Sequence, residues 1–68
     1  MNQIIYDKEL GDWSNIPDKD YNYWVKMFPE LSIDEQLRKM ARWLYANPTR
    51  HKKNWKRFII NWLERANA

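Results

Sequence analysis

The last third of the chain carries an apolar stripe with the repeat of an α-helix. The stripe consists of Trp55, Phe58, Ile59, Trp62 and Leu63, spaced i, i+3, i+4, i+7 and i+8. Side chains with this spacing lie on one face of a helix, because each helical turn holds 3.6 residues. The spacing predicts an amphipathic helix from about residue 50 to residue 65, which must bury its apolar face against other elements.

A second helical pattern lies between two prolines in the first half of the chain. It begins near Asp18, directly after Pro17, and acidic residues in a first turn favour a helix start. The apolar face of this helix is formed by Tyr21, Trp24, Val25 and Phe28. Pro29 ends it, because the residue before a proline is pushed out of the helical region.

The clearest helix start is at Ser32, which is followed three residues later by Glu35. This spacing is typical of a capping box, with Ser32 as the N-cap. The inner face is formed by Ile33, Leu37, Met40 and Leu44, widened by Ala41 and Trp43. Asn47 and Pro48 end this helix.

Together these patterns predict an all-α fold, a small three-helix bundle over residues 18–68 preceded by an irregular arm over residues 1–17. Gly11, Asn15 and Pro17 interrupt the arm, which shows no sustained period, and we expect no β-hairpin. At 68 residues the chain forms one small domain at most.

Aromatic side chains have to supply much of the core of so short a chain. The sequence has five Trp, four Tyr and two Phe but no Cys, so disulfides cannot stabilise it. Trp43, Trp55 and Trp62 fit the inner faces of the predicted helices and are assigned to the core. Tyr23 and Tyr45 lie off these faces, and we expect them to be exposed.

The composition argues against an enzyme. The chain has no Cys and only one histidine, His51, which excludes Cys/His nucleophiles and thiolate zinc sites. Gly11 is the only glycine, which excludes a glycine-rich phosphate loop. Acidic pairs stand at helix starts, where capping explains them. We therefore expect no catalytic site, no cofactor and no metal.

The hydropathy of the chain also argues against a membrane protein. The mean hydropathy is −0.95, and no apolar run approaches the ~20 residues of a membrane-spanning helix. The polar N-terminus does not resemble a signal peptide. We expect a cytoplasmic protein.

Charge is distributed unevenly along the chain. Residues 1–34 hold three Lys against seven acids, and residues 35–68 hold nine Lys or Arg against two acids. The densest basic cluster contains Arg50, Lys52, Lys53, Lys56 and Arg57. Two interpretations stay open: a solvated helix face balanced by the acidic half, or a surface that binds phosphate groups.

Four linked motifs lie within roughly residues 22–65: W-x2-M-F-P-x-L, then Q-L-R-K-M-x2-W-L, then A-N-P-x-R-x-K-K, and R-F-I-x-N-W-L-x-R. The matching residues are Trp24, Met27, Phe28, Pro29 and Leu31; Gln36, Leu37, Arg38, Lys39, Met40, Trp43 and Leu44; Ala46, Asn47, Pro48, Arg50, Lys52 and Lys53; and Arg57, Phe58, Ile59, Asn61, Trp62, Leu63 and Arg65. With these motifs the chain resembles the C-terminal helical module of phage and prophage DNA replication proteins: replisome organisers, helicase loaders and primosomal proteins. The resemblance implies a small helical module with a role in DNA replication.

The basic cluster and the resemblance together predict a non-enzymatic DNA-binding module. The expected phosphate contacts are Lys52, Lys53, Lys56 and Arg57, with Arg50, Arg38, Lys39 and Arg42 as secondary contacts. The sequence leaves open whether single- or double-stranded DNA is bound. Exposed tyrosines beside basic residues would suit single strands, whose bases stack on aromatic rings.

A second hypothesis belongs to another class, a protein-interaction module. It would dock on a replicative helicase or a helicase-loader ATPase and either recruit or inhibit it. The basic face would then meet an acidic protein surface, with exposed aromatic residues as hot spots. A small core also leaves homo-oligomerisation open.

Overall fold

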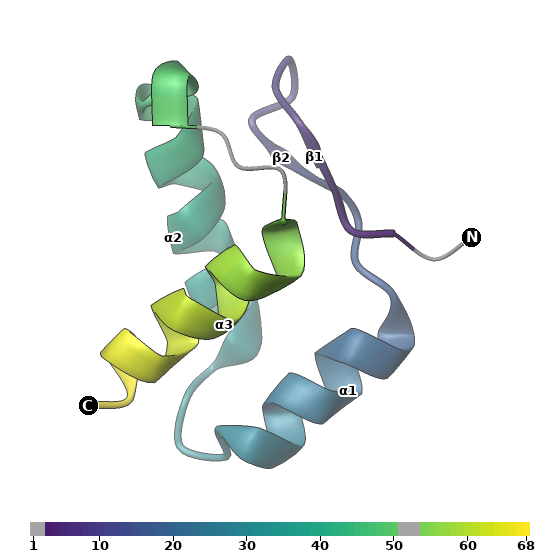
Figure 1. Cartoon of the computed structure of the whole chain (residues 1–68), viewed down its shortest axis with the longest axis vertical. Helices are drawn as coiled ribbons and strands as arrows, with labels where there is room; N and C mark the ends of the chain where they lie inside the picture. The colour runs from purple at the N-terminus through teal and green to yellow at the C-terminus, as the bar shows by residue number, and fades with distance from the viewer. Residues whose placement is uncertain (1–2, 51–53) are drawn as a thin grey trace.

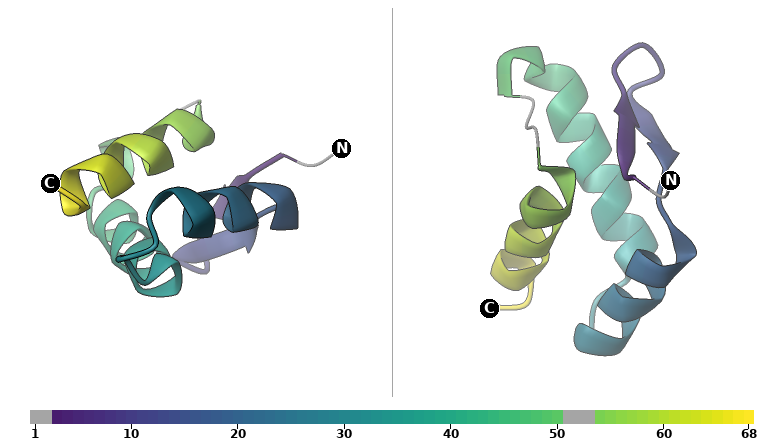
Figure 2. Two further views of the ribbon diagram at one scale, coloured as in Figure 1. Left: turned by 90° about the horizontal axis from the view of Figure 1, so that it is seen from below. Right: turned by 45° about the vertical axis from the view of Figure 1, so that its right-hand side comes forward.

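A computed structural model describes residues 3–50 and 54–68 of the chain. The described elements follow in the order β1 (Ile5–Asp7), β2 (Asp12–Asn15), α1 (Asp18–Met27), α2 (Ile33–Ala46), the 3-10 helix η1 (Pro48–Arg50) and α3 (Trp55–Ala66). The structure is flat, with extents of 30 × 29 × 17 Å. The strands form an antiparallel hairpin beside α2, and α3 packs against α2 with its N-terminal end toward the hairpin (Figure 1). Two further views show α1 crossing near the start of α2 (Figure 2).

The prediction of an all-α fold is wrong, because residues 5–15 of the expected irregular arm form a two-stranded antiparallel sheet. Tyr6 pairs with Trp13 and Asp7 pairs with Asp12, and the register shifts between Ile5 and Tyr6. Strands of three and four residues are too short to show a period of two in the sequence. The correct fold class is therefore mixed, and the described residues form three α-helices and a small hairpin.

The turn of the hairpin depends on Asp7 and Gly11. The Asp7 carboxylate accepts hydrogen bonds from the backbone N–H groups of Glu9, at 2.9 Å, and Leu10, at 3.1 Å. Gly11 has a φ of +66°, in the left-handed region that L-residues with a Cβ disfavour, and its N–H donates to the Asp7 carbonyl at 2.9 Å. These local bonds reverse the chain without help from the core.

Two aromatic side chains attach the hairpin to α2. The Tyr6 hydroxyl donates to the carbonyl of Ala41, and the Trp13 indole N–H donates to the carbonyl of Leu37, both at 2.9 Å. The two acceptors are one helical turn apart, so the paired residues Tyr6 and Trp13 lie along α2. Burial raises the pKa of Tyr6 above its ordinary value of 10.0. Trp55 of α3 completes a cluster with these rings, at centroid distances of 5.7 Å from Tyr6 and 5.6 Å from Trp13.

The predicted bounds of the first two helices are close to the observed ones. α1 begins at Asp18 as expected, and Ser32 is the N-cap of α2, with its hydroxyl accepting from the Glu35 N–H at 3.4 Å. The third helix begins at Trp55 and not near residue 50. Its N-cap is Asn54, whose side-chain oxygen accepts from the Arg57 N–H at 3.1 Å.

The core lies where the helices meet, and α2 contributes more than half of it. The buried apolar side chains are Tyr6, Trp24, Ile33, Leu37, Met40, Ala41, Leu44, Ile59 and Leu63. The inner face predicted for α2 is thus confirmed except for Trp43, which is 36% exposed, and Val25 of α1 is exposed as well. Tyr23 and Tyr45 are exposed, as predicted.

The turn gives a direct test of the hairpin. We expect Gly11→Ala to lower the free energy of unfolding by about 1–2 kcal/mol, because a Cβ disfavours the left-handed region. The new Cβ would also lie 2.7 Å from the Cδ1 atom of Tyr45. Urea unfolding measures the loss. In a Tyr45→Ala background the steric part should disappear and the conformational part remain, whereas an unchanged stability in both backgrounds would contradict this hairpin.

Candidate nucleic-acid interface

The predicted basic cluster is only partly described by the structure. Lys52 and Lys53 lie outside the described residues, and Arg50 ends η1 with its side chain also outside them. Lys56 and Arg57 lie in the first turn of α3, where both are exposed. The Nζ atom of Lys56 is 3.3 Å from the Oδ1 atom of Asp20 on α1. Lys56 therefore bridges α3 to α1 and is partly neutralised there.

The secondary contacts predicted on α2 are exposed. Arg38, Lys39 and Arg42 are the basic residues of this helix. Lys39 forms an i, i+4 pair with Glu35 at 3.9 Å, with both side chains about half exposed at 48% and 61%. Such exposed pairs contribute little to stability and are readily exchanged for another anion. Arg38, Arg42 and Arg57 form no ion pair within the described part of the chain.

Trp43, Phe58 and Trp62 form an aromatic strip along the seam between α2 and α3. Trp43 and Phe58 are stacked at 6.2 Å with an angle of 30° between their planes. Trp62 lies 6.3 Å from Trp43 and 6.0 Å from Phe58. Phe58 and Trp62 are half-buried, and Trp43 is 36% exposed. The strip therefore covers the core at the seam and at the same time presents aromatic surface to solvent.

The assignment of Trp43 to the core is wrong. Trp62 packs against the core but is only half-buried. The interior of the seam is filled by Met40, Leu44 and Ile59, which are all fully buried. Trp43 is displaced from the middle of this face by one residue, about 100° around the helix from Leu44. That angular offset is the signal in the sequence for a ring at the edge of the core.

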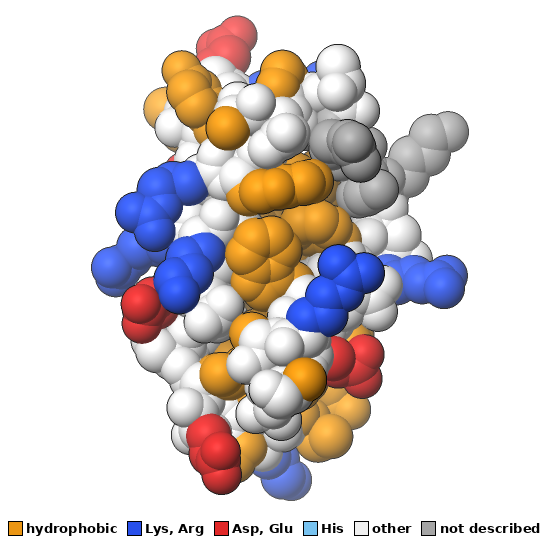
Figure 3. Space-filling view, turned by 90° about the vertical axis from the view of Figure 1, so that its left-hand side faces the viewer, with side chains coloured by type: hydrophobic (Ala, Val, Ile, Leu, Met, Phe, Trp, Pro, Cys, Tyr) orange, Lys and Arg blue, Asp and Glu red, His pale blue; other side chains and the backbone are white. Residues whose placement is uncertain are grey.

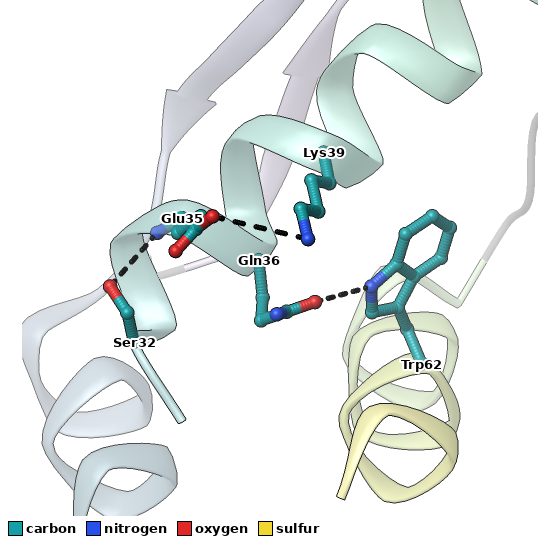
Figure 4. Close-up of polar contacts among 5 residues, drawn as sticks. All are labelled: Ser32, Glu35, Gln36, Lys39 and Trp62. Atoms are coloured by element: carbon teal, nitrogen blue, oxygen red, sulfur yellow. Dashed lines mark hydrogen bonds and ion pairs between the residues drawn. The ribbon is translucent and has the colours of Figure 1, made fainter. Parts of the chain in front are cut away.

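A hydrogen bond between the helices holds Trp62 in position. Its indole N–H donates to the side-chain oxygen of Gln36 on α2 at 3.0 Å (Figure 4). The close-up also shows Ser32 and Glu35 at the start of the same helix, and Lys39 one turn further along (Figure 4). The indole polar atom is thus satisfied inside the protein, and the ring offers its apolar surface outward.

Basic side chains border the aromatic strip on both sides. Figure 3 shows an apolar band on the face formed by α2 and α3, with Lys and Arg side chains along both of its edges. Lys39 lies one turn before Trp43 on the same side of α2, and Arg65 lies one turn after Trp62 on the same side of α3. Arg65 is not among the predicted contacts, although its i+3 spacing from Trp62 places it beside the strip.

Two negative findings concern the described residues. None of their helices is long and apolar enough to cross a membrane. Within residues 3–50 and 54–68, no three His, Asp or Glu side chains come together in a way that could hold a metal ion.

Comparisons with known proteins add no assignment. No protein-family model matches the sequence, and no curated protein and no solved structure gives a significant match. The resemblance to phage replication modules therefore stays a prediction.

The bond between Gln36 and Trp62 can be tested separately from any ligand. We expect Gln36→Leu to lower the free energy of unfolding by about 0.5–1.5 kcal/mol, because the half-buried indole N–H loses its acceptor. It should also shift the indole N–H resonance of Trp62 in an NMR spectrum. Gln36→Glu keeps an acceptor and serves as the control; an identical Trp62 resonance in wild type and both variants would show that the bond is absent.

Proposed function

We propose that this protein is a non-enzymatic DNA-binding module whose binding face is formed by α2 and α3. The observation that carries the proposal is the aromatic strip with basic residues on both edges. Lys39 of α2 and Arg65 of α3 lie beside the strip. Arg38, Arg42 and Arg57 add exposed positive charge elsewhere on the same two helices. Nucleic acid matches both parts of this surface, because it combines a negatively charged backbone with the flat aromatic faces of its bases.

Electrostatics favours the phosphate backbone as the ligand of the basic edges. α2 and α3 together carry six basic residues against Asp34, Glu35 and Glu64, and the sequence adds Arg50, Lys52 and Lys53 between them. Each Lys or Arg that neutralises a phosphate releases condensed counterions, so binding is favourable at low salt. A partner protein with an uncharged surface would gain no comparable binding free energy from these basic residues.

The proposed setting is DNA replication in a bacterium or a phage-infected host, in the cytoplasm. Its support is the resemblance of residues 22–65 to the C-terminal modules of phage replication proteins. The absence of cysteine and the single histidine support a binding role without catalysis.

A second candidate function is docking on a replicative helicase or its loader. It is favoured by a different surface, on α1, where Tyr23 is 55% exposed and Met27 is 52% exposed. The two residues are four apart and lie on the same side of the helix. Exposed aromatic and Met side chains are frequent anchors in protein interfaces.

The double variant Tyr23→Ser, Met27→Ser tests this second function. It should abolish helicase capture in nuclease-treated pulldowns with purified proteins and leave DNA binding unchanged.

The salt dependence of DNA binding tests the proposed function. We expect measurable binding at ~50 mM salt, with log K falling linearly as log salt rises. The triple variant Arg38→Gln, Lys39→Gln, Arg42→Gln should reduce the slope by about 0.7–0.9 for each phosphate that these side chains neutralise in the wild-type complex. Fluorescence anisotropy with a labelled oligonucleotide measures both quantities.

The control for this test removes the same charge from the other half of the chain. Lys8, Lys19 and Lys26 are exposed residues of the hairpin turn and α1, so their triple Gln variant has the same net charge as the α2 variant. It should keep nearly the full salt slope. Equal reductions of the slope in the two variants would mean that net charge alone governs binding, and no binding of either DNA form at ~50 mM salt would reject the proposal.

A further inference from the structure

The aromatic strip carries an inference about the form of DNA that is bound, and it rests on the proposed function. Phosphate contacts alone are available on single and double strands alike. The form must therefore be decided by the groups between the two basic edges. In this protein those groups are the rings of Trp43, Phe58 and Trp62.

Trp43 is the ring of the strip that is most open to solvent. It is 36% exposed, whereas Phe58 and Trp62 are half-buried. Phe58 supports Trp43 in a stacked arrangement, with an angle of 30° between their planes, and Trp62 packs against it edge-on. Contacts with two rings hold the indole in place, so little side-chain freedom is lost when a base stacks on it.

A flat aromatic surface suits unpaired bases and not a duplex. In a duplex the flat faces of the bases are stacked on one another, and a protein reaches only their edges in the grooves. Single-stranded DNA leaves these faces free, and each stacks on an aromatic ring regardless of sequence. Reading a duplex would instead require a helix or ribbon that enters a groove, and the strip lies in the seam between two helices.

The basic edges complete a path for a single strand. Lys39 lies one turn from Trp43 along α2, and Arg65 lies one turn from Trp62 along α3. Their positions allow phosphates to be held beside the rings. Lys39 is paired only loosely with Glu35, at 3.9 Å, so its ammonium group is available for exchange.

We propose that the aromatic strip is a stacking platform for the bases of single-stranded DNA, with Trp43 as the principal contact ring and Lys39 and Arg65 as phosphate contacts on its two sides. Binding is independent of base sequence, because stacking and phosphate contacts read no base edge. Duplex DNA meets only the basic edges and binds more weakly.

The test compares a labelled oligothymidine and a mixed-sequence single strand with a duplex of equal length, all by anisotropy at the same salt concentration. We expect the wild-type protein to bind both single strands more tightly than the duplex. Trp43→Ala should weaken single-strand binding on the order of 10- to 100-fold, leave duplex binding unchanged, and leave the salt slope unchanged because no charge is removed. Trp43→Phe should restore most of the affinity, since it keeps a ring.

A second variant keeps the test valid if Trp43→Ala does not fold. Arg65→Gln should reduce the single-strand salt slope by about 0.7, the value expected for one phosphate contact, and Lys8→Gln should not. Duplex binding as tight as single-strand binding, or equal weakening on both forms in Trp43→Ala, would overturn the inference but leave DNA binding intact. Failure to bind any DNA would instead reject the proposed function.

Discussion

The packing of α2 against both the hairpin and α3 is the interaction on which the rest of the structure depends. A chain of 68 residues cannot build a thick core, so one helix has to serve as the common partner of all other elements. At the hairpin, Tyr6 and Trp13 donate hydrogen bonds to α2 carbonyls that are one turn apart. At α3, Gln36 of α2 accepts from Trp62 of α3. In each of these bonds an aromatic residue supplies the donor as well as the apolar surface.

The same packing accounts for the candidate site. Met40, Leu44, Ile59 and Leu63 are all 0% exposed and form the interior where α2 meets α3. Trp43, Phe58 and Trp62 are more exposed and lie around this interior. The exposed face of Trp43 is thus a consequence of core packing, and the neighbouring basic residues place positive charge beside this ring. Structure and proposed binding are linked through this one seam.

The helical part of the fold could be predicted from sequence because its signals are local. The apolar period of 3.6, the Ser32 cap and the prolines place α1 and α2 close to their observed bounds. The hairpin could not be recognised in this way, because its strands are short and it is attached to α2 by contacts over 24 and 35 residues. The local signal for it is Asp7 followed four residues later by Gly11, which together form the turn.

The site is less predictable from sequence than the fold. The dense run of charge indicates residues 50–57, of which Lys56 contacts Asp20 and Lys52 and Lys53 lie outside the described residues. Helical spacing shows which residues share a face, but it does not show how deep a ring lies when two helices meet. For Trp43 that depth depends on the size of its neighbours across the seam. Only the packed structure supplies this information.

The most direct measurement follows the five indole N–H signals in a two-dimensional NMR spectrum during titration with a single-stranded oligothymidine. Because Trp43 and Trp62 lie in the aromatic strip, we expect their signals to shift as DNA is added. Trp24 is 1% exposed in the core, and Trp13 donates its indole N–H to the Leu37 carbonyl, so their signals should stay in place. If DNA binds and the signals of Trp43 and Trp62 do not move, the α2–α3 seam is not the binding face.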